Sequence, residues 1–433
     1  MGNERAVSQT RPREQGQTIV LVALAMVTLL AMAALAIDVV TLYVARSEMQ
    51  RAADAAALAG AKAFVDSGVT TDPTNTNLQT LAQDMANATI NSIVQQNKVA
   101  GSPPVLASPP AFNFSNLGNP QITVTLQRTD LPTFFARIWG KRLMTVTATA
   151  TAEAYNPSNS QTNTGNYVPI APKCVKPLLI PNKDPSSGSN FVDPNTGAAT
   201  TGILGEQITL SDACPNGSKT CGPVVLPSPL VLPSPPTGYY LPAAVTSNTA
   251  NLCPSCTGSD DFEQSIECCD FNRYSCGAPL PTTVDTTGGP IPTSADLTMS
   301  GNNSRKDVKN GAQCLIHESA GQDTLNTANF LSNAGPMAIT AGSGPLSGKL
   351  VTTSRSIATL PIFDTASLNP ATGQVTVVGF LQVFIDPQAT ALPGNGDIPV
   401  TILNIAGCGN NPSTGPPVSG GGISPIPVRL IHQ

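Results

Sequence analysis

The sequence predicts a membrane-anchored α+β protein, in which a single N-terminal transmembrane helix continues into a small α+β domain. A loop- and β-rich region that carries disulfides follows this domain. Three observations indicate this architecture: one long apolar run near the N-terminus, strand-like alternation after it, and ten cysteines that all lie between Cys174 and Cys408. At 433 residues the chain is longer than one typical domain, so two or three units are expected.

Composition limits the function classes. The formal net charge is −5 and only 11% of the residues are charged, so the chain has no surplus of cations to neutralise the phosphates of a nucleic acid. Two histidines, His317 and His432, leave little for histidine-based catalysis or metal binding. Aromatic residues make up 4%, whereas 36 glycines and 40 prolines favour loops and strands over a large core.

The apolar run extends from Ile19 to Ile37, with Thr28 as its only polar residue. A helix rises about 1.5 Å per residue, so a run of this length nearly crosses a hydrocarbon layer of roughly 30 Å. A segment that crosses lipid must pair its own backbone groups, which requires a helix here. We therefore predict a transmembrane helix over residues 18–40, after a short arm at residues 1–17.

A cleaved signal peptide is the alternative interpretation of this run. Ala34-Leu35-Ala36 has the small residues of a cleavage site. Signal peptides have apolar cores of about 7–15 residues, however, and this run is longer. A retained anchor is therefore the preferred prediction.

The orientation of the span depends on the cysteines. Arg5, Arg11 and Arg13 precede the span, but basic residues also follow it, so the positive-inside rule is nearly balanced. An even number of cysteines in a Pro/Gly-rich region is typical of disulfides formed in an oxidising compartment. We therefore expect residues 1–17 in the cytoplasm and everything after Asp38 outside it.

The helix is expected to continue beyond the span. Residues 38–63 contain no proline, and no glycine before Gly60, and they are rich in alanine, the strongest helix former. A stripe of small apolar residues follows helical spacing: Ala45, Met49, Ala52, Ala53, Ala56, Ala59 and Ala63. This stripe packs either only on the core of its own domain or also against a partner helix, and the sequence leaves both alternatives open.

The small α+β domain is predicted over residues 41–155. The elements expected after the stem helix are a helix at 78–98, strands at 121–128 and 144–155, and a short helix at 131–139. Pro132 in a first turn and Gly140 just past the end mark the short helix. One face of the second strand is expected to carry Val146, Ala148, Ala150, Ala152 and Ala154.

The segment around the predicted span carries the most specific pattern. It reads GQTIVLVALA from Gly16 and AIDVVTLYVARSEMQRAADAAALAGA from Ala36 to Ala61. These residues, AADAAALAGA above all, resemble the N-terminal signature of the TadG-like proteins of bacterial Tad/Flp pilus-assembly systems. The resemblance covers roughly residues 14–155. Looser similarity to strands of longer family members lies at residues 354–364 and 373–386.

The resemblance implies an inner-membrane protein whose extracytoplasmic domain assists assembly of a thin surface pilus or of its export machine. Some longer family members carry a von Willebrand A domain, whose metal site needs Asp-x-Ser-x-Ser after a buried strand. The nearest candidate is Asp184, Ser186 and Gly188, where the last hydroxyl is missing. Prolines also make the preceding LLIPNK segment a poor strand, so no metal site is expected.

Family resemblance also raises the question of processing as a pilin. A prepilin peptidase cuts after a glycine and requires glutamate five residues later. Gly16 is present, but Leu21 occupies the position of the glutamate. Processing as a pilin subunit is therefore disfavoured.

Residues 156–350 form a Pro/Gly/Cys-rich region. The polar segment 157–166 and the Pro-rich segment 224–236 are interpreted as spacers. Nine cysteines lie here: Cys174, Cys214, Cys221, Cys253, Cys256, Cys268, Cys269, Cys276 and Cys314. Disulfides are the preferred interpretation, in pairings that the sequence does not define.

Cys253-Pro-Ser-Cys256 has the spacing of a zinc or redox site. A redox CxxC opens a helix, whereas this one lies among Asn, Pro, Ser and Gly. A zinc site needs a second close pair, but Cys268 and Cys269 are adjacent and rarely ligate one ion together. Disulfides are thus favoured over both.

No enzyme motif is evident in the region. It has no Gly-rich phosphate loop, no HExxH and no GxSxG. Asp260, Asp261 and Glu263 lack the calcium-loop pattern and are expected in a solvated loop.

Residues 351–433 are predicted to be β-rich. Strands are expected at Ile357–Phe363, Val375–Ile385 and Ile398–Ile405, the last ending near Cys408. The Gly-rich segment 415–425 is expected to be a mobile tail.

The sequence therefore favours a single-pass, non-enzymatic accessory protein of a Tad/Flp-type pilus or its secretion machine, in the bacterial inner membrane. Its partners would be pilus subunits or other proteins of that system, with no nucleic acid and no small-molecule substrate. No catalytic, cofactor-binding or metal-binding residue is assigned. Two alternatives stay open: a minor pilin-like subunit of the fibre, and a surface adhesin released after signal cleavage.

Overall fold

The computed structural model describes most of the chain outside its longest loops. The described residues are 15–115, 119–140, 142–154, 172–212, 237–243, 253–256, 258, 261–269, 274–277, 279–281, 304–317, 321–367, 374–387, 397–408 and 424–431. Two compact units are formed by Met1–Ala56, Asn91–Pro110 and Val124–Ala150, and by Ala57–Ile90, Ala111–Thr123 and Thr151–Gln433. The expected spacers at 157–166 and 224–236, most of the expected tail at 415–425 and the arm before Gln15 lie outside the described residues.

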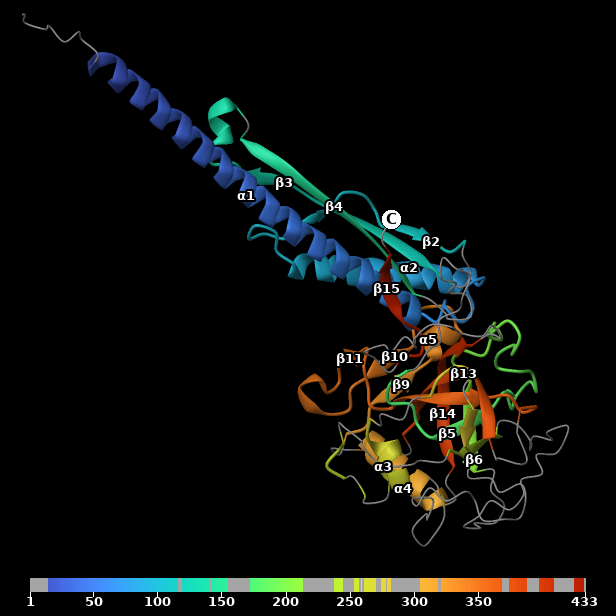
Figure 1. Ribbon diagram of the computed structural model, residues 1–433. Helices are drawn as coiled ribbons and strands as arrows, with labels where there is room; N and C mark the ends of the chain where they lie inside the picture. Colours follow the sequence, from blue (N-terminus) through green and yellow to red (C-terminus); the bar gives the residue numbers. More distant parts are fainter. Residues whose placement is uncertain are drawn as a thin grey trace, which may run out of the picture. The chain divides into compact units, whose positions relative to one another are not determined.

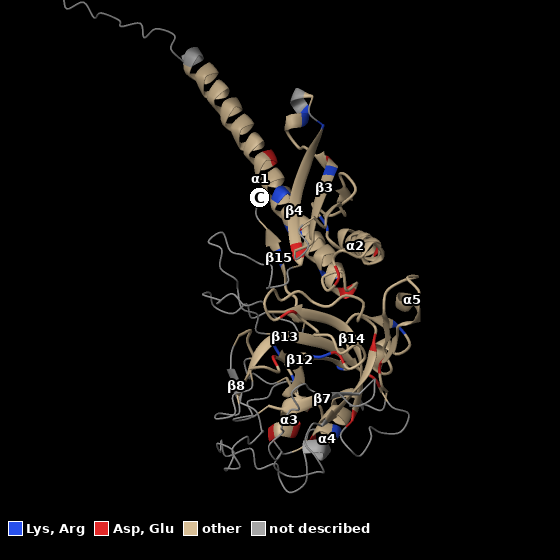
Figure 2. Ribbon diagram, turned by 90° about the vertical axis from the view of Figure 1, so that its right-hand side faces the viewer, with Lys and Arg blue, Asp and Glu red and all other residues tan. Residues whose placement is uncertain are grey.

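Helix α1 runs without interruption from Gln15 to Asp66 (Figure 1). It is the one helix among the described residues that is long and apolar enough to cross a membrane. The side chains of its apolar run are exposed, and Figure 2 shows no charged position along that half of the helix. Thr28 donates its hydroxyl to the carbonyl of Ala25 at 2.9 Å, so the one polar side chain of the run is paired within the helix.

One side of the second half of α1 is buried, and the predicted continuation of the helix is confirmed. Of the predicted stripe, all members except the half-buried Ala59 are at most 3% exposed. Glycine at position 60 allows a very close approach: a Cβ there would lie 2.8 Å from Ile122 Cδ1 and 3.0 Å from Ile90 Cδ1. Small residues thus bring α1 against strand β3 and helix α2 of its own chain.

A five-stranded sheet accompanies these helices. Its elements are α2 (Thr76–Gln96), β1 (Val105–Leu106), β2 (Ala111–Asn113), β3 (Gln121–Pro132), β4 (Leu143–Ala154) and β15 (Val428–Ile431). The strand order is β1-β3-β4-β15, and β2 also pairs with β3. Ile122, Val124 and Leu126 alternate into the core as predicted, and so does the Val/Ala face of β4.

The predicted short helix at 131–139 is only partly correct. Pro132 is the last residue of β3 and not part of a first helical turn. A 3-10 helix, η1 (Ala136–Trp139), covers the second half of the predicted range and ends at Gly140 in the left-handed region, with φ 85°. Proline has no N–H to donate, and the strand tolerates it at Pro132 because this residue is the last of β3.

Strand β15 was not expected from the sequence. It pairs antiparallel with β4, with Val428 opposite Ala154 and Ile431 opposite Thr151. Arg429 donates to the buried carboxylate of Glu153, with Nε at 2.7 Å from Oε1. A segment of the C-terminal region thus completes a sheet built from the N-terminal domain.

A second sheet closes on itself. It contains β5 (Leu178–Pro181), β6 (Gln207–Asp212), β7 (Thr237–Pro242), β8 (Pro279–Pro281), β12 (Ile357–Phe363), β13 (Gln374–Ile385) and β14 (Ile398–Gly407). The order β12-β5-β7-β6-β14-β13 returns to β12 through the β12–β13 pair, and β8 extends β13. Closure removes exposed strand edges. The three predicted C-terminal strands are confirmed, but their closure with β5, β6 and β7 was not anticipated.

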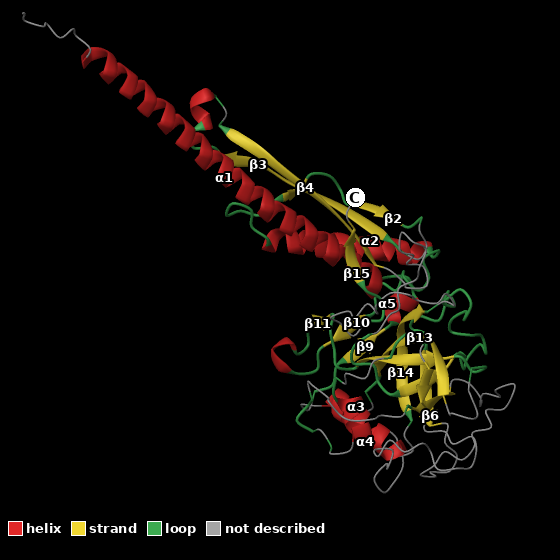
Figure 3. Ribbon diagram, viewed as in Figure 1, coloured by secondary structure: helices red, strands yellow, loops and turns green. Residues whose placement is uncertain are grey.

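Two helices and small elements complete this unit (Figure 3). The further elements are α3 (Asp261–Glu267), α4 (Ser304–His317), β9 (Thr324–Asn326), α5 (Ala328–Leu331), β10 (Ala338–Thr340), η3 (Gly344–Leu346) and β11 (Leu350–Val351). Apolar side chains from β5, β6, β12, β13 and β14 converge with Ile266 of α3 and Ala312 of α4 around a cavity of about 10 Å³. The helices therefore pack on the apolar side of the closed sheet.

Within this unit, Asn404 joins β14 to the end of α1. Its amide Nδ2 donates to the carbonyl of Val65 at 2.9 Å, and its Oδ1 accepts the hydroxyl of Thr71. The backbone N–H of Ile405 in turn donates to Thr71 Oγ1 at 3.1 Å. Asn404 is 1% exposed, so its amide and the polar groups of Val65 and Thr71 form hydrogen bonds with one another instead of with water.

Replacing Asn404 by alanine is expected to destabilise the chain by about 2–4 kcal/mol, because it leaves buried partners on Val65 and Thr71 unpaired. The measurement is the urea midpoint of the full chain in detergent. Asn77→Ala is the matched control, since Asn77 is exposed on α2. Equal midpoints for the two variants would contradict the assigned role of Asn404.

Candidate functional site

The β3–β4 connection is tied to α1 by a single carboxylate. Asp38 Oδ1 accepts the backbone N–H of Phe134 at 2.8 Å, and Oδ2 accepts those of Phe135 and Ala136 at 3.0 and 2.7 Å. Asp38 is only 4% exposed. Three charge-assisted hydrogen bonds compensate a carboxylate that is costly to bury beside an apolar segment. The connection is therefore held at the level where the apolar run of α1 ends.

The local backbone explains why the connection presents three N–H groups together. The first N–H groups of a short helix have no partner within it, and η1 begins at this point. After η1, Gly140 turns the chain back and donates its N–H to the carbonyl of Arg137 at 3.1 Å. Thr133 donates both its N–H and its hydroxyl to the carbonyl of Arg142, each at 3.3 Å, which closes the base of the connection.

A second set of hydrogen bonds, centred on Arg128, holds the α2–β1 loop. Arg128 of β3 donates to both carboxylate oxygens of Asp130, at 2.8 and 3.2 Å, and to the carbonyls of Val99 and Ala100. The Arg128 guanidinium holds the pKa of Asp130 below its ordinary value. On the other side of the loop, Glu48 of α1 accepts the N–H of Ala100 at 2.7 Å. The loop is thus fixed between β3 and α1.

The β3–β4 connection and the α2–β1 loop, held by these hydrogen bonds, border a pocket of about 170 Å³. Its lining combines α1, the α2–β1 loop and the end of β3: Asp38, Thr41, Leu42, Ala45, Ala100, Leu131, Pro132, Thr133 and Phe134. Phe134 and Leu143, on either side of the connection, are each 57% exposed. The arrangement offers an apolar surface rather than a set of reactive groups.

The predicted disulfides are confirmed, and their pairing is now defined. Four bonds join Cys174–Cys269, Cys253–Cys268, Cys256–Cys314 and Cys276–Cys408. The two cysteines of the CxxC motif therefore pair with different partners and not with each other. Cys214 and Cys221 lie outside the described residues, as does His432.

The acidic candidates from the sequence belong to the fold. Asp184 is 1% exposed and accepts the N–H groups of Ser186 and Ser187 at 3.0 and 3.1 Å. The strand before it, which we expected to be poor, is β5, fully buried and paired with β12. Two backbone N–H groups and the Ser187 hydroxyl thus engage the Asp184 carboxylate within its own turn.

The solvated loop expected at Asp260, Asp261 and Glu263 is wrong for the last two residues, whereas Asp260 lies outside the described residues. Asp261 and Glu263 lie in the first turn of α3, and Phe262 between them is 2% exposed. Acidic side chains suit this position because a helix N-terminus carries partial positive charge. Burial of the apolar side of α3 on the closed sheet thus prevails over the polar local composition. Of the residues that the structure describes, no group of three His, Cys, Asp or Glu side chains is arranged for a metal ion.

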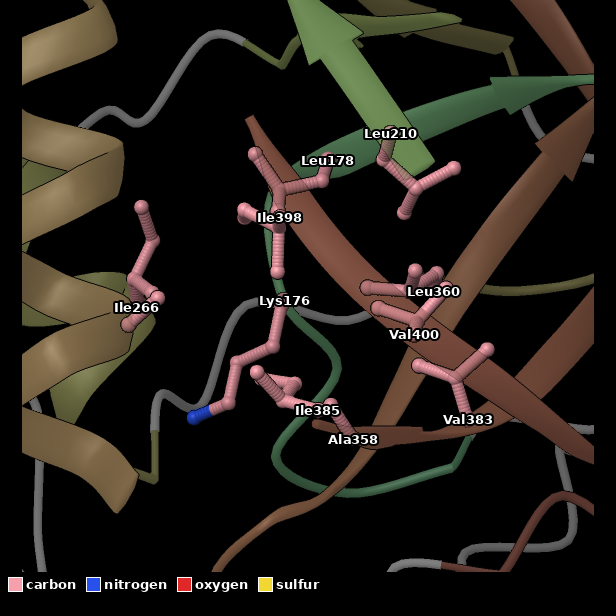
Figure 4. A pocket seen from close by; sticks show the side chains of 11 residues that line it. Lys176, Leu178, Leu210, Ile266, Ala358, Leu360, Val383, Ile385, Ile398 and Val400 are labelled. Atoms are coloured by element: carbon pink, nitrogen blue, oxygen red, sulfur yellow. The ribbon is translucent and has the colours of Figure 1, made fainter. Parts of the chain in front are cut away.

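Lys176 and Glu267 were not anticipated from the sequence. Lys176 is 5% exposed and lies among apolar side chains at the cavity inside the closed sheet (Figure 4). Its ammonium donates to the carbonyl of Cys268 at 2.7 Å. Glu267, 2% exposed, accepts the N–H of Gly258 at 3.0 Å. A single Lys or Glu in loop-rich sequence carries no periodic signal, which is why neither residue could be singled out.

Burial raises the pKa of Glu267 to about 7, and the neighbouring Glu263 carboxylate acts in the same direction. The Gly258 N–H and the Lys176 ammonium oppose this shift. Burial also raises the pKa of Asp386 to about 6, against a hydrogen bond from Thr401. Both carboxyl groups hold a proton more tightly in the folded chain than in the unfolded chain.

The stability of the closed sheet is therefore expected to fall as pH rises. A raised folded pKa contributes stability below the unfolded value of about 4.5, and this contribution is lost towards pH of about 7. Glu267→Gln removes its share, so its urea midpoint should fall less between pH of about 5 and about 8 than that of the wild type. Asp386 still contributes in the variant. Asp84→Asn, at an exposed position of α2, is the control, and identical slopes in all three proteins would contradict the assignment.

Replacing Asp38 by alanine is expected to free the β3–β4 connection. Three bonds to a charged acceptor are lost, so trypsin should cut after Arg137 or Arg142 about ten- to a hundredfold faster. The measurement is the rate of limited proteolysis of the full chain in detergent, followed by mass spectrometry. Asp54→Ala is the matched control, because Asp54 lies on the same helix and accepts a hydrogen bond from the Gln50 side chain, one turn away, at 2.8 Å. Unchanged cleavage in Asp38→Ala would refute the role of the carboxylate.

Comparison with known proteins adds one match. Residues 16–63 match the family described as "Putative Flp pilus-assembly TadE/G-like". None of the curated proteins and none of the solved structures matches the chain. The matched residues cover the apolar run of α1, Asp38 and the whole small-residue stripe from Ala45 to Ala63. The N-terminal helix of this chain is therefore similar to the putative TadE/G-like family of Flp pilus assembly over residues 16–63.

Proposed function

We propose that this chain is a non-enzymatic, single-pass protein of the bacterial cytoplasmic membrane. It assists assembly of a Tad/Flp-type pilus, or of its secretion machine, through extracytoplasmic contacts with pilus subunits or other proteins of the system. The TadE/G-like family of residues 16–63 supports the connection to the pilus. Membrane anchoring and the position of the folded units rest on the observations that follow.

One observation supports a retained anchor: exposed apolar residues of α1 continue past Ala36, the end of the small-residue signal-cleavage motif Ala34-Leu35-Ala36. Ile37, Val39, Val40 and Tyr43 are 51–76% exposed. A chain released after Ala36 would present these side chains to water in its first two helical turns. A retained helix covers them with lipid, which supports an anchor rather than a removed leader.

The disulfides support an extracytoplasmic position for the folded units. They join residues 15 to 132 positions apart in the chain. Structural bonds of this kind form and persist in oxidising compartments and are rare in the cytoplasm. With the cysteine-containing region outside, residues before the span lie in the cytoplasm.

Contact rather than catalysis is favoured by what the reactive groups do. Eight cysteines are disulfide-bonded, and the Asp184 and Asp38 carboxylates accept backbone N–H groups of the fold. The structure offers these groups as scaffolding. Exposed apolar side chains such as Phe134 and Leu143 remain available for contacts with partner proteins.

The test is complementation of a chromosomal deletion. Loss of surface pili is expected on deletion, with pilin still present in the cells, and the full chain should restore the fibres. The restored protein should stay in the membrane through a carbonate wash and begin at Met1 or Gly2 on N-terminal sequencing. A double variant, Ala34→Leu with Ala36→Leu, removes the small-residue cleavage site and should behave identically.

Three results would overturn the proposal in different ways. Normal pili in the deletion strain would remove the role in assembly. A mature protein that starts at Ile37 and is soluble would make it a released surface protein. A protein that starts at Gln17 and co-purifies with fibres would make it a pilin-like subunit.

A further inference from the structure

The tip of the β3–β4 connection combines apolar, aromatic and basic residues. Its sequence from Leu131 to Leu143 reads LPTFFARIWGKRL, with three basic residues and no acidic one. This is unusual in a chain with a net charge of −5. Figure 2 shows basic positions at this tip, and Phe134, Arg137, Arg142 and Leu143 are all exposed. We call residues 131–143 the hairpin tip.

The hairpin tip is fixed at the boundary of the apolar run of α1. Asp38 is the first charged residue after Ile37, and its carboxylate accepts three N–H groups of the tip at 2.7–3.0 Å. A carboxylate that is fully hydrogen-bonded and covered can lie at the edge of a hydrocarbon layer, whereas an unpaired one is expelled from it. The three hydrogen bonds to Asp38 therefore hold the hairpin tip at the level where the lipid headgroups of an anchored chain begin.

The exposed side of α1 places the lipid surface at least this far along the helix. Asp38, Leu42 and Ala45 face the pocket and the chain. Val39, Val40, Tyr43 and Val44, on the other side, are 48–76% exposed. Exposed apolar side chains extend along α1 from Ile19 to Val44, which is longer than the roughly 20 residues needed to cross the hydrocarbon layer. The helix thus carries apolar surface into the interfacial zone on the side opposite the tip.

We propose that the hairpin tip is a second membrane contact, which inserts Phe134 and Leu143 into the interfacial layer and binds anionic lipid headgroups through Arg137 and Arg142. The inference rests on the proposed anchoring of α1. Aromatic residues concentrate at membrane interfaces, and basic residues beside them are attracted by anionic lipids. A partner helix would not require basic residues at the hairpin tip. The three basic and no acidic residues of the tip instead match the anionic headgroups of the bilayer that holds α1.

Such a contact has a mechanical consequence. A single helix leaves a domain free to rotate and tilt about its point of attachment. A second contact, held to that helix by Asp38, fixes how the first sheet stands on the membrane. Partner proteins in the same membrane then meet this sheet in one orientation.

The chain provides its own probe, because its single tryptophan is Trp139, within the tip. The full chain is reconstituted into vesicles of phosphatidylethanolamine and phosphatidylglycerol, with lipids brominated on the acyl chains. Flotation first establishes that the chain is anchored. We expect Trp139 fluorescence to be quenched by the brominated lipids and protected from iodide in the water.

Matched variants separate the apolar and the electrostatic contributions. Phe134→Ser with Leu143→Ser should reduce quenching, whereas Leu346→Ser, at a residue 52% exposed in η3, should not. Arg137→Gln with Arg142→Gln should lower the equilibrium constant for insertion of the hairpin tip, read from Trp139 quenching, by about fivefold for each arginine. The double variant should also quench equally in phosphatidylglycerol and phosphatidylcholine vesicles. Lys349→Gln, also exposed, is the control for loss of a cation.

The outcomes distinguish the two proposals. A chain that does not float with the vesicles overturns the anchored function and this inference with it. A chain that floats while Trp139 stays open to iodide and unquenched by lipid overturns the second contact alone. Protection of Trp139 from both quenchers would place the tip against protein and would equally overturn a lipid contact.

Discussion

Asp38 marks the point at which α1 changes its surroundings. Before it, the side chains of the helix are apolar and exposed; after it, one side of the helix is buried in protein. A carboxylate at such a boundary requires partners, and the chain supplies them as three backbone N–H groups from the β3–β4 connection. The same bonds satisfy the start of η1, whose N–H groups otherwise lack acceptors. One side chain therefore marks where α1 first contacts the rest of its domain and positions the end of the sheet.

Beyond that point, small residues replace large ones as the means of packing. Ala53, Ala56 and Ala57 are fully buried, and Gly60 leaves no room for a Cβ between Ile122 and Ile90. Close backbone approach gives many dispersion contacts without aromatic side chains, which suits a chain with 4% aromatics. The closed sheet is stabilised differently, by covalent bonds across long loops. Such bonds restrict the unfolded chain most when the loops are long, as for Cys276 and Cys408, 132 residues apart.

Local periodicity accounts for what could be predicted. The apolar run with its alanine-rich continuation predicted α1, helical spacing predicted α2, and alternation predicted β3 and β4 within a few residues, since each pattern reflects the environment of its own segment. Pairings between distant segments carry no such signal. β5 is only four residues long and includes Pro181, so its burial follows from neighbours such as β12 that no local window contains. The closure of the second sheet was missed for the same reason.

The candidate site shows the same limit. The position of Asp38 at the end of the run was evident, but its acceptor role depends on a connection almost one hundred residues later. Arg128 and Asn404 also act through partners far away in the chain. A lone polar residue in a buried pattern, such as Arg128 in the alternation of β3, is the signal that would have found them. Its partner would still have required the structure.

The pairing of β15 with β4 has a consequence for biogenesis. Glu153 and Arg429, which meet across this pair, are 276 residues apart. Synthesis proceeds from the N-terminus, so α1 and β4 are made long before β15. Until then, the outer edge of β4 is unpaired and the buried Glu153 lacks its cation. Completion of the first sheet therefore waits for synthesis of the segment that carries β15, and until then the chain has an open strand edge along β4.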